Sequence, residues 1–132
     1  MSKNRSKNLA NSDTPVADST LSTGKYFEQE AQKMLESQGL TLISKNFRTK
    51  LGEIDLIMQD SDTIVFIEVR YRKRANFGNA SSTVSAEKQR KITLAANQYL
   101  TEHNLHNKKP CRFDVVSFDN KECDWVKNAF TC

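Results

Sequence analysis

The sequence has 132 residues, of which 37% are hydrophobic and 27% charged, and its 20 Lys and Arg exceed its 16 Asp and Glu for a net charge of +4. This length fits one domain with an ordinary core, and no run reaches the roughly 18 apolar residues of a transmembrane helix, so we expect no membrane contact. The three cysteines lack the spacing of a zinc site, which indicates thiols in a reducing cytoplasm.

Residues 1–23 are rich in Ser, Asn, Asp and Thr, with basic residues but no apolar block behind them. This composition excludes a secretory signal and predicts a disordered polar tail, which leaves 24–132 as a single domain. Ser22 or Thr23 is a suitable N-cap for a helix over residues 24–38, and Gly39 is a suitable stop. One face of that helix carries an apolar stripe at core-facing spacing: Phe27, Ala31, Met34 and Leu35.

A first strand is expected over residues 40–47, and a basic turn over 48–52 leads into a hairpin of strands 52–58 and 64–70. Because side chains alternate along a strand, Ile54, Leu56 and Met58 are expected on one face. Asp55 is expected on the other face.

Two carboxylates interrupt these apolar strands, Asp55 on one and Glu68 on its neighbour. Burying both costs several kcal/mol unless something cationic compensates. A structural ion-pair cluster with Arg70 is one explanation. A divalent-metal site is the other, because Mg²⁺ binds to one or two carboxylates together with water and phosphate oxygens.

Basic residues gather around these acids in three clusters. A basic collar beside carboxylates suits a polyanionic substrate whose chemistry needs a metal, whereas any single cluster also fits a solvated charged loop. The candidates for nucleic-acid binding are Arg48, Lys50, Arg72, Lys73, Arg74, Lys88, Arg90 and Lys91.

Ser85 predicts the start of a second helix over residues 86–103, where first-turn amides also favour phosphate. Strands are expected over 112–118 and, more briefly, 123–126. Asp114 either pairs with a basic residue or supports the acidic site. Tyr71 and Phe77 either stack on exposed bases or anchor the core and the loop between 75 and 83. The elements predict an α/β fold, a mixed central β-sheet flanked by helices in the order α-β-β-β-α-β(-β).

The acids and their neighbours resemble a known signature. Asp55 followed by Glu68-Val69-Arg70 resembles the Asp…Glu-x-Lys pattern of the restriction-endonuclease-like, or PD-(D/E)XK, nuclease superfamily. The longer run from Gly24 to Phe130 resembles the bacterial YraN family, whose fold is similar to that of archaeal Holliday-junction resolvases. The segments that carry this resemblance are Asn46-Phe47-Arg48, Gly52 to Ile57, Phe66 to Arg72 and Cys111 to Val116.

The resemblance implies a restriction-endonuclease-like core and a metal-dependent DNA endonuclease that hydrolyses phosphodiester bonds, acting on branched DNA in repair or recombination. Asp55 and Glu68 would hold Mg²⁺ or Mn²⁺, and a homodimer would fit the resolvase likeness. Arg70 stands where the superfamily has lysine; it stays protonated and cannot be a general base, but it can hold a phosphate.

Glu28 is a candidate site residue because of a further family pattern, G-x-x-G-E-x-x-A. This pattern maps onto Gly24, Phe27, Glu28 and Ala31, with Phe27 in place of the second glycine. The resemblance gives Glu28 a place at the metal. The alternative is a first-turn glutamate that interacts favourably with the helix dipole.

Two other functions stay open. A nucleic-acid-binding module on the same fold, with little or no catalysis, would keep salt-sensitive binding without Asp55. A structural or interaction protein, whose acids and Arg70 form only an internal network, would lose stability when Glu68 is truncated.

Overall fold

The computed structural model describes residues 19–71, 84–119 and 122–131. Its elements follow the order α-β-β-β-α-β-β, which confirms the predicted fold class. They are α1 (Ser19–Ser37), β1 (Thr41–Arg48), β2 (Glu53–Asp60), β3 (Thr63–Tyr71), α2 (Ala86–Glu102), β4 (Cys111–Phe118) and β5 (Cys123–Phe130). Among the described residues, no helix is long and apolar enough to span a membrane.

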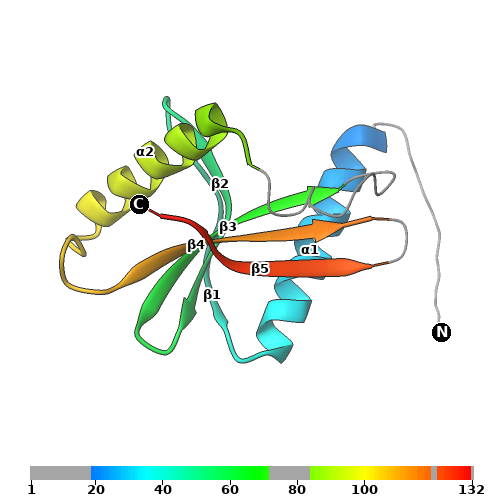
Figure 1. The fold of residues 1–132 in the computed structure, drawn as a ribbon, viewed down its shortest axis with the longest axis horizontal. Helices are drawn as coiled ribbons and strands as arrows, with labels where there is room; N and C mark the ends of the chain where they lie inside the picture. Colours follow the sequence, from blue (N-terminus) through cyan, green and yellow to red (C-terminus); the bar gives the residue numbers. More distant parts are fainter. Residues whose placement is uncertain (1–18, 72–83, 120–121, 132) are drawn as a thin grey trace.

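The five strands form one mixed sheet in the order β1-β2-β3-β4-β5. Three neighbouring pairs are antiparallel, and β3 and β4 are parallel. A parallel pair needs a long crossover connection, and α2 lies in that connection. Figure 1 shows α1 and α2 on opposite faces of the sheet, so the central strands are covered on both sides.

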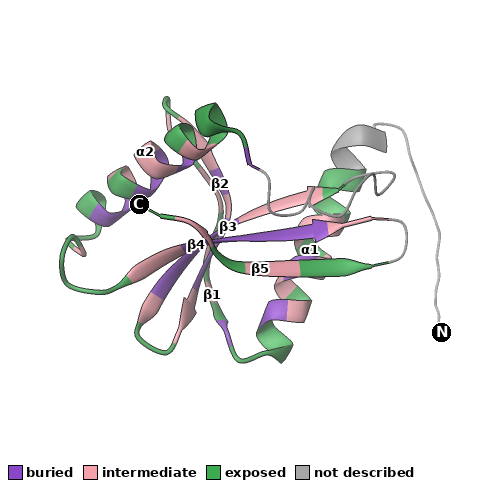
Figure 2. Cartoon of the chain, in the orientation of Figure 1, coloured by how far each residue is buried: buried purple, intermediate pink, exposed green. Residues whose placement is uncertain are grey.

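Two apolar clusters fill the space between the sheet and its helices. On β3, Ile64 and Phe66 belong to the cluster that includes α2, whereas Val65 and Ile67 belong to the cluster that includes α1. This alternation explains why β3 is apolar almost throughout, because a strand covered on both faces buries every side chain. Figure 2 shows that residues of the central strands are largely buried, whereas those of the edge strand β5 are intermediate or exposed.

Several element boundaries differ from the expectations. Helix α1 begins at Ser19, so the prediction of an N-cap at Ser22 or Thr23 was wrong, and residues 19–23 of the predicted tail are helical. No proline interrupts this stretch, and a single glycine at Gly24 costs only about 1 kcal/mol in a helix. The rest of the predicted tail, residues 1–18, lies outside the described residues.

At the start of α2, the prediction of a cap at Ser85 is confirmed. The Ser85 Oγ accepts a hydrogen bond from the Lys88 N–H at 3.1 Å.

Strand β5 is longer than expected, with 8 residues where only 123–126 were predicted. Its second half pairs with β4 through Phe130 and Phe113, whose ring centroids lie 4.7 Å apart in a stacked arrangement.

Asp114 on β4 is fully buried and pairs with Arg112, with Nε–Oδ1 at 3.0 Å. Of the two alternatives for Asp114, pairing with a basic residue is therefore the one observed.

Candidate active site

Asp55 lies on β2 opposite a β1 residue with an unusual backbone angle. The β1–β2 register pairs Phe47 with Ile54 and Lys45 with Leu56, and it passes over the position between them. Asn46, which stands opposite Asp55 there, has a φ of 54°, in the left-handed region that asparagine tolerates better than most residues.

The β2 side chains do not alternate regularly on either side of Asp55. Ile54 packs with Ile57 in the cluster under α2, whereas Leu56 and Met58 pack in the cluster under α1. The prediction that Ile54, Leu56 and Met58 share one face was therefore wrong, because it assumed an unbroken alternation through Asp55.

The two predicted acids meet where β2 and β3 stop pairing. The β2–β3 register ends at Leu56 and Ile67, while β3 continues beside β4 as far as Tyr71. Past that end, the Asp55 Oδ2 accepts a hydrogen bond from the backbone N–H of Val69 at 2.8 Å. Glu68 alternates with Phe66 and so lies on the α2 face. The end of the β2–β3 ladder thus holds the two carboxylates side by side.

Burial dominates the electrostatics of this pair. Burial first, and then the negative charge of Glu68, raises the pKa of Asp55 to about 7, against a smaller opposing effect of the Val69 N–H. Glu28 and Glu53 raise it a little further. Burial also raises the pKa of Glu68, while Lys88 and a hydrogen bond with Asp55 act in the opposite direction. Strongly raised acids in a site of this kind mark a candidate functional centre.

The cation beside Glu68 comes from α2. Lys88 Nζ lies 3.7 Å from the Glu68 Oε2, and the side chain of Glu68 is only 14% exposed whereas that of Lys88 is 48% exposed. Lys88 was predicted as a nucleic-acid contact only, and its contact with Glu68 joins elements 20 positions apart. Arg70 lies two residues beyond Glu68 on β3, half-buried, in register with Ser117 of β4.

Glu28 approaches from the α1 side of the sheet. Its Oε1 accepts a hydrogen bond from Asn46 Nδ2 at 3.0 Å, and it lines a small pocket of about 70 Å³ with Lys25 and Lys45 among its neighbours. Within residues 19–71, 84–119 and 122–131, no group of three or more His, Cys, Asp or Glu side chains is arranged to hold a metal ion. The geometry therefore presents a two-carboxylate centre, Asp55 with Glu68, and Glu28 as a more distant charge.

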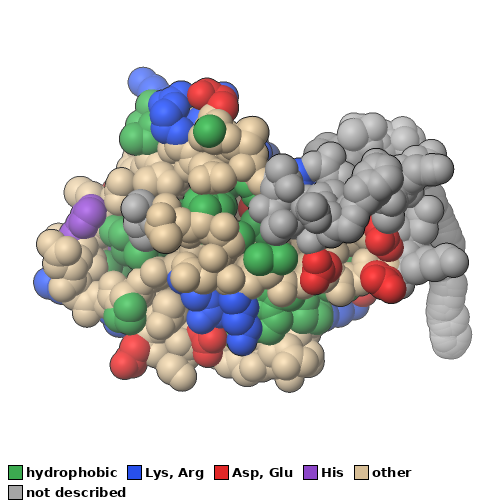
Figure 3. Space-filling view, viewed as in Figure 1, with side chains coloured by type: hydrophobic (Ala, Val, Ile, Leu, Met, Phe, Trp, Pro, Cys, Tyr) green, Lys and Arg blue, Asp and Glu red, His purple; other side chains and the backbone are tan. Residues whose placement is uncertain are grey.

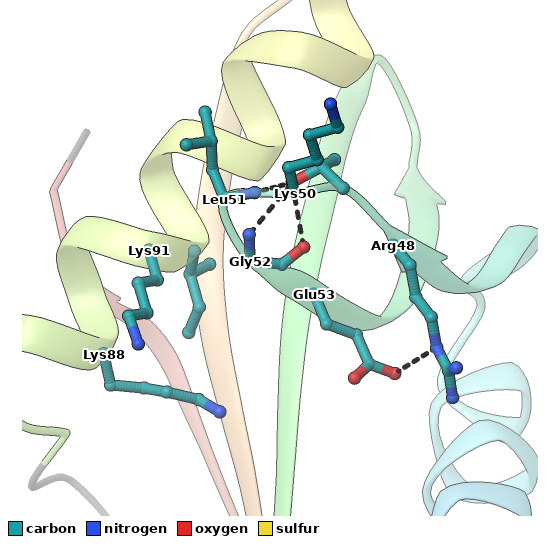
Figure 4. Close-up of a pocket in the computed structure, with 9 residues that line it drawn as sticks. Arg48, Lys50, Leu51, Gly52, Glu53, Lys88 and Lys91 are labelled. Atoms are coloured by element: carbon teal, nitrogen blue, oxygen red, sulfur yellow. Dashed lines mark hydrogen bonds and ion pairs between the residues drawn. The ribbon is translucent and has the colours of Figure 1, made fainter.

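Next to this centre is a cationic pocket of about 510 Å³, between the β1–β2 turn and the first turns of α2 (Figure 4). The turn is closed by Thr49, whose Oγ1 accepts from the N–H groups of Leu51 and Gly52, both at 2.9 Å. A Cβ on Gly52 would lie 2.5 Å from the carbonyl oxygen of Lys91, so glycine lets the turn pack directly against α2. The lining residues are Arg48, Thr49, Lys50, Leu51, Gly52, Glu53, Lys88, Lys91 and Ile92.

Four of the predicted nucleic-acid contacts thus line one pocket: Arg48, Lys50, Lys88 and Lys91. Arg48 Nε lies 3.3 Å from the Glu53 carboxylate, and Lys50 points away from it (Figure 4). Arg90 is not among the lining residues and pairs with Glu87 at 2.9 Å. Figure 3 shows Lys and Arg side chains gathered at the end of the molecule where α2 begins. The predicted contacts Arg72, Lys73 and Arg74 lie outside the described residues.

The two predicted stacking aromatics have different outcomes. Tyr71 stacks on Phe27 of α1, with ring centroids 4.5 Å apart and ring planes at 9°, and Phe27 also packs near Phe118. Tyr71 is therefore an anchoring aromatic that ties the end of β3 to α1, although 38% of it is exposed. Phe77 lies outside the described residues.

Sequence comparisons agree with the resemblance described above. Over 110 residues the chain is 44% identical to a UPF0102 protein of Aeromonas hydrophila, which covers 83% of this chain and 85% of the relative. It is 46% identical over 114 residues to one of Pseudomonas entomophila (83% and 93%) and 48% identical over 106 residues to one of Herminiimonas arsenicoxydans (80% and 84%). A family model, "Uncharacterised protein family UPF0102", matches residues 27–118, which include both acids, the cationic turn and Lys88. The chain therefore belongs to the UPF0102 family, the YraN family that its motifs resemble.

Proposed function

We propose that this protein is a metal-dependent nuclease that hydrolyses phosphodiester bonds in DNA, with branched DNA as the first substrate to test. The observation that carries the proposal is the pair of half-buried carboxylates, Asp55 and Glu68, directly beside a pocket with four cationic side chains. A pocket of that charge suits a polyanion, and paired acids suit a divalent cation.

The chemistry of the two acids fits Mg²⁺ or Mn²⁺. Burial raises the pKa of both carboxyls, and Lys88 offsets only part of that rise at Glu68. Mg²⁺ commonly binds to one or two carboxylates and completes its shell with water and phosphate oxygens. Asp55 and Glu68 would hold the ion, with Glu28 as a more distant acid. When bound, such an ion lowers the pKa of a coordinated water and stabilises charge on the phosphate.

The protein's own side chains have separate tasks in this proposal. The Val69 N–H fixes the orientation of the Asp55 carboxylate through its 2.8 Å hydrogen bond. Lys88 and Lys91 bind the phosphodiester backbone as it passes between the β1–β2 turn and α2. Arg70 remains protonated, so it stabilises negative charge and does not accept a proton.

The test is cleavage of labelled duplex, flap and four-way-junction DNA with Mg²⁺ or Mn²⁺. Wild type is compared with Asp55→Asn and Glu68→Gln, which keep the shape of each side chain and remove its charge. We expect metal-dependent cutting by the wild type and a loss of at least about 100-fold in both variants, because each loses a group that holds the metal. Lys33→Met on α1 is the control, since Lys33 is exposed and pairs with Glu30 of the same helix at 3.5 Å.

A second function, a nucleic-acid-binding module without catalysis, is favoured by two observations. Arg70 replaces the lysine of the superfamily signature, and the described residues provide two acids at the centre and no group of three arranged to hold a metal. In that case the wild type and both variants bind DNA and none of them cuts it. If the wild type neither binds nor cuts DNA, the remaining hypothesis is a structural or interaction protein.

A further inference from the structure

Lys88 contacts both parts of the candidate site, the acid pair and the cationic pocket. Its ammonium contacts the Glu68 carboxylate at 3.7 Å, and its side chain also lines the cationic pocket. Figure 4 shows it extended from α2 toward the strands, alongside Lys91. Lys88 therefore stands between the acid pair and the place where a phosphate would enter.

The other cations in the first turns of α2 have a different partner. Arg90 and Lys91 both pair with Glu87, at 2.9 and 3.7 Å, and Glu87 is an exposed residue of the same turn. Lys88 pairs instead with an acid of the candidate centre, and its backbone N–H is fixed by the Ser85 cap. The cap holds the start of the side chain in place, while the half-exposed ammonium keeps room to move.

We propose that Lys88 couples metal binding to phosphodiester binding, because Glu68 and a phosphate in the pocket compete for its ammonium. Without a metal, Lys88 neutralises part of the charge on Glu68. With a divalent cation at Asp55 and Glu68, the attraction of Glu68 for Lys88 would weaken, and the Lys88 ammonium would be available to bind a phosphate oxygen in the pocket. This inference rests on the proposed metal centre and names the residue that links it to the nucleic acid.

The coupling has two measurable consequences. Removing Lys88 removes a cation that competes with the metal, so the metal should bind more tightly to the free protein. Coupling between two ligands is reciprocal, so metal should strengthen DNA binding in the wild type and do so much less without Lys88. Both are equilibrium quantities that do not depend on whether the protein cuts DNA.

The experiment measures Mn²⁺ affinity by titration calorimetry without DNA, and four-way-junction DNA affinity with and without Ca²⁺, at fixed pH and ionic strength. For Lys88→Met we expect Mn²⁺ to bind about 3- to 10-fold more tightly than to the wild type. The ratio of DNA affinities with and without Ca²⁺ should fall to about 1, so that the metal no longer strengthens DNA binding. Lys91→Met is the matched control, because it lines the same pocket but pairs with Glu87. It should weaken DNA binding while leaving Mn²⁺ affinity and the Ca²⁺ effect unchanged. Lys88→Arg should keep part of the coupling, because it keeps the charge.

The inference is overturned if Lys88→Met, folded by circular dichroism, binds Mn²⁺ like the wild type and keeps the Ca²⁺ effect, or if the wild type binds no Mn²⁺. Failure of the nuclease proposal looks different. A wild type that never cuts DNA but shows Lys88-dependent coupling would refute the nuclease and support the inference. Normal cutting with unchanged coupling in Lys88→Met would do the reverse.

Discussion

Two acids of the sheet, the fully buried Asp114 and the half-buried Asp55, have opposite surroundings. Asp114 on β4 is 0% exposed, and its carboxylate accepts hydrogen bonds from the Arg112 guanidinium at 3.0 to 3.2 Å. It also accepts from Trp125 Nε1 and from the backbone N–H of Asn128, both at 2.9 Å. Each donor is supplied by the fold, so this carboxylate ties β4 to β5 and is part of the structure.

Asp55 has a much poorer set of partners. It accepts one hydrogen bond from a backbone N–H and stands beside a second acid, Glu68, with further negative charge from Glu28 and Glu53. A satisfied buried carboxylate stabilises a fold, whereas two neighbouring acids that repel each other reduce its stability, even where one of them pairs with a cation, as Glu68 does with Lys88. Asp114 is therefore part of the structure, while Asp55 and Glu68 are the acids that we propose bind a metal.

The largest expected effect is on Asp114. Asp114→Ala should lower the free energy of unfolding by about 3–5 kcal/mol, because it leaves the Arg112 guanidinium and the Trp125 and Asn128 N–H groups without their acceptor. Urea denaturation measures this. Asp60→Ala is the control, since Asp60 also contacts Arg112 at 3.0 Å but is 34% exposed, and it should cost less than about 1 kcal/mol. Equal losses in both variants would contradict the assignment of Asp114.

A smaller effect of opposite sign is expected at Asp55. Its pKa is raised to about 7 from 3.8, so between about pH 4 and 7 the folded state holds a proton that the unfolded state has released, and the contribution of Asp55 to stability falls as pH rises through that range. Asp55→Asn cannot ionise and should be about 1–3 kcal/mol more stable than the wild type at pH 8, with little difference at pH 4. Urea denaturation at both pH values measures the change. Asp62→Asn at the exposed hairpin tip is the control, and an Asp55→Asn that is less stable at pH 8 would refute the reasoning.

The smallest effect concerns the charges around Asp55. Glu68 raises the pKa of Asp55 more than Glu28 does, so Glu68→Gln should lower that pKa more than Glu28→Gln. Carboxyl-carbon NMR titration of Asp55 in each variant gives the order directly. The reverse order would mean that Glu28, which hydrogen-bonds Asn46 at 3.0 Å, is closer to the centre than the structure places it.

Much of the fold followed from local patterns. The apolar stripe of α1, the apolar runs of β2 and β3 and the Ser85 cap predicted the order α-β-β-β-α-β(-β), which the structure confirms. The failures occurred where non-local contacts override local preference. The β5 strand extends to Phe130, whose ring stacks on Phe113, and Ile54 packs in the cluster under α2 whereas Leu56 packs in the cluster under α1.

The sequence by itself determined which acids interrupt apolar strands, because a carboxylate in such a run is visible without coordinates. It also placed Arg48, Lys50, Lys88 and Lys91 among the cations that would face a polyanion. Only the tertiary structure decided that Asp114 is satisfied by Arg112 and that Lys88 meets Glu68. Those partners are set by how strands and helices pack against one another. A single sequence carries no local signal for that packing.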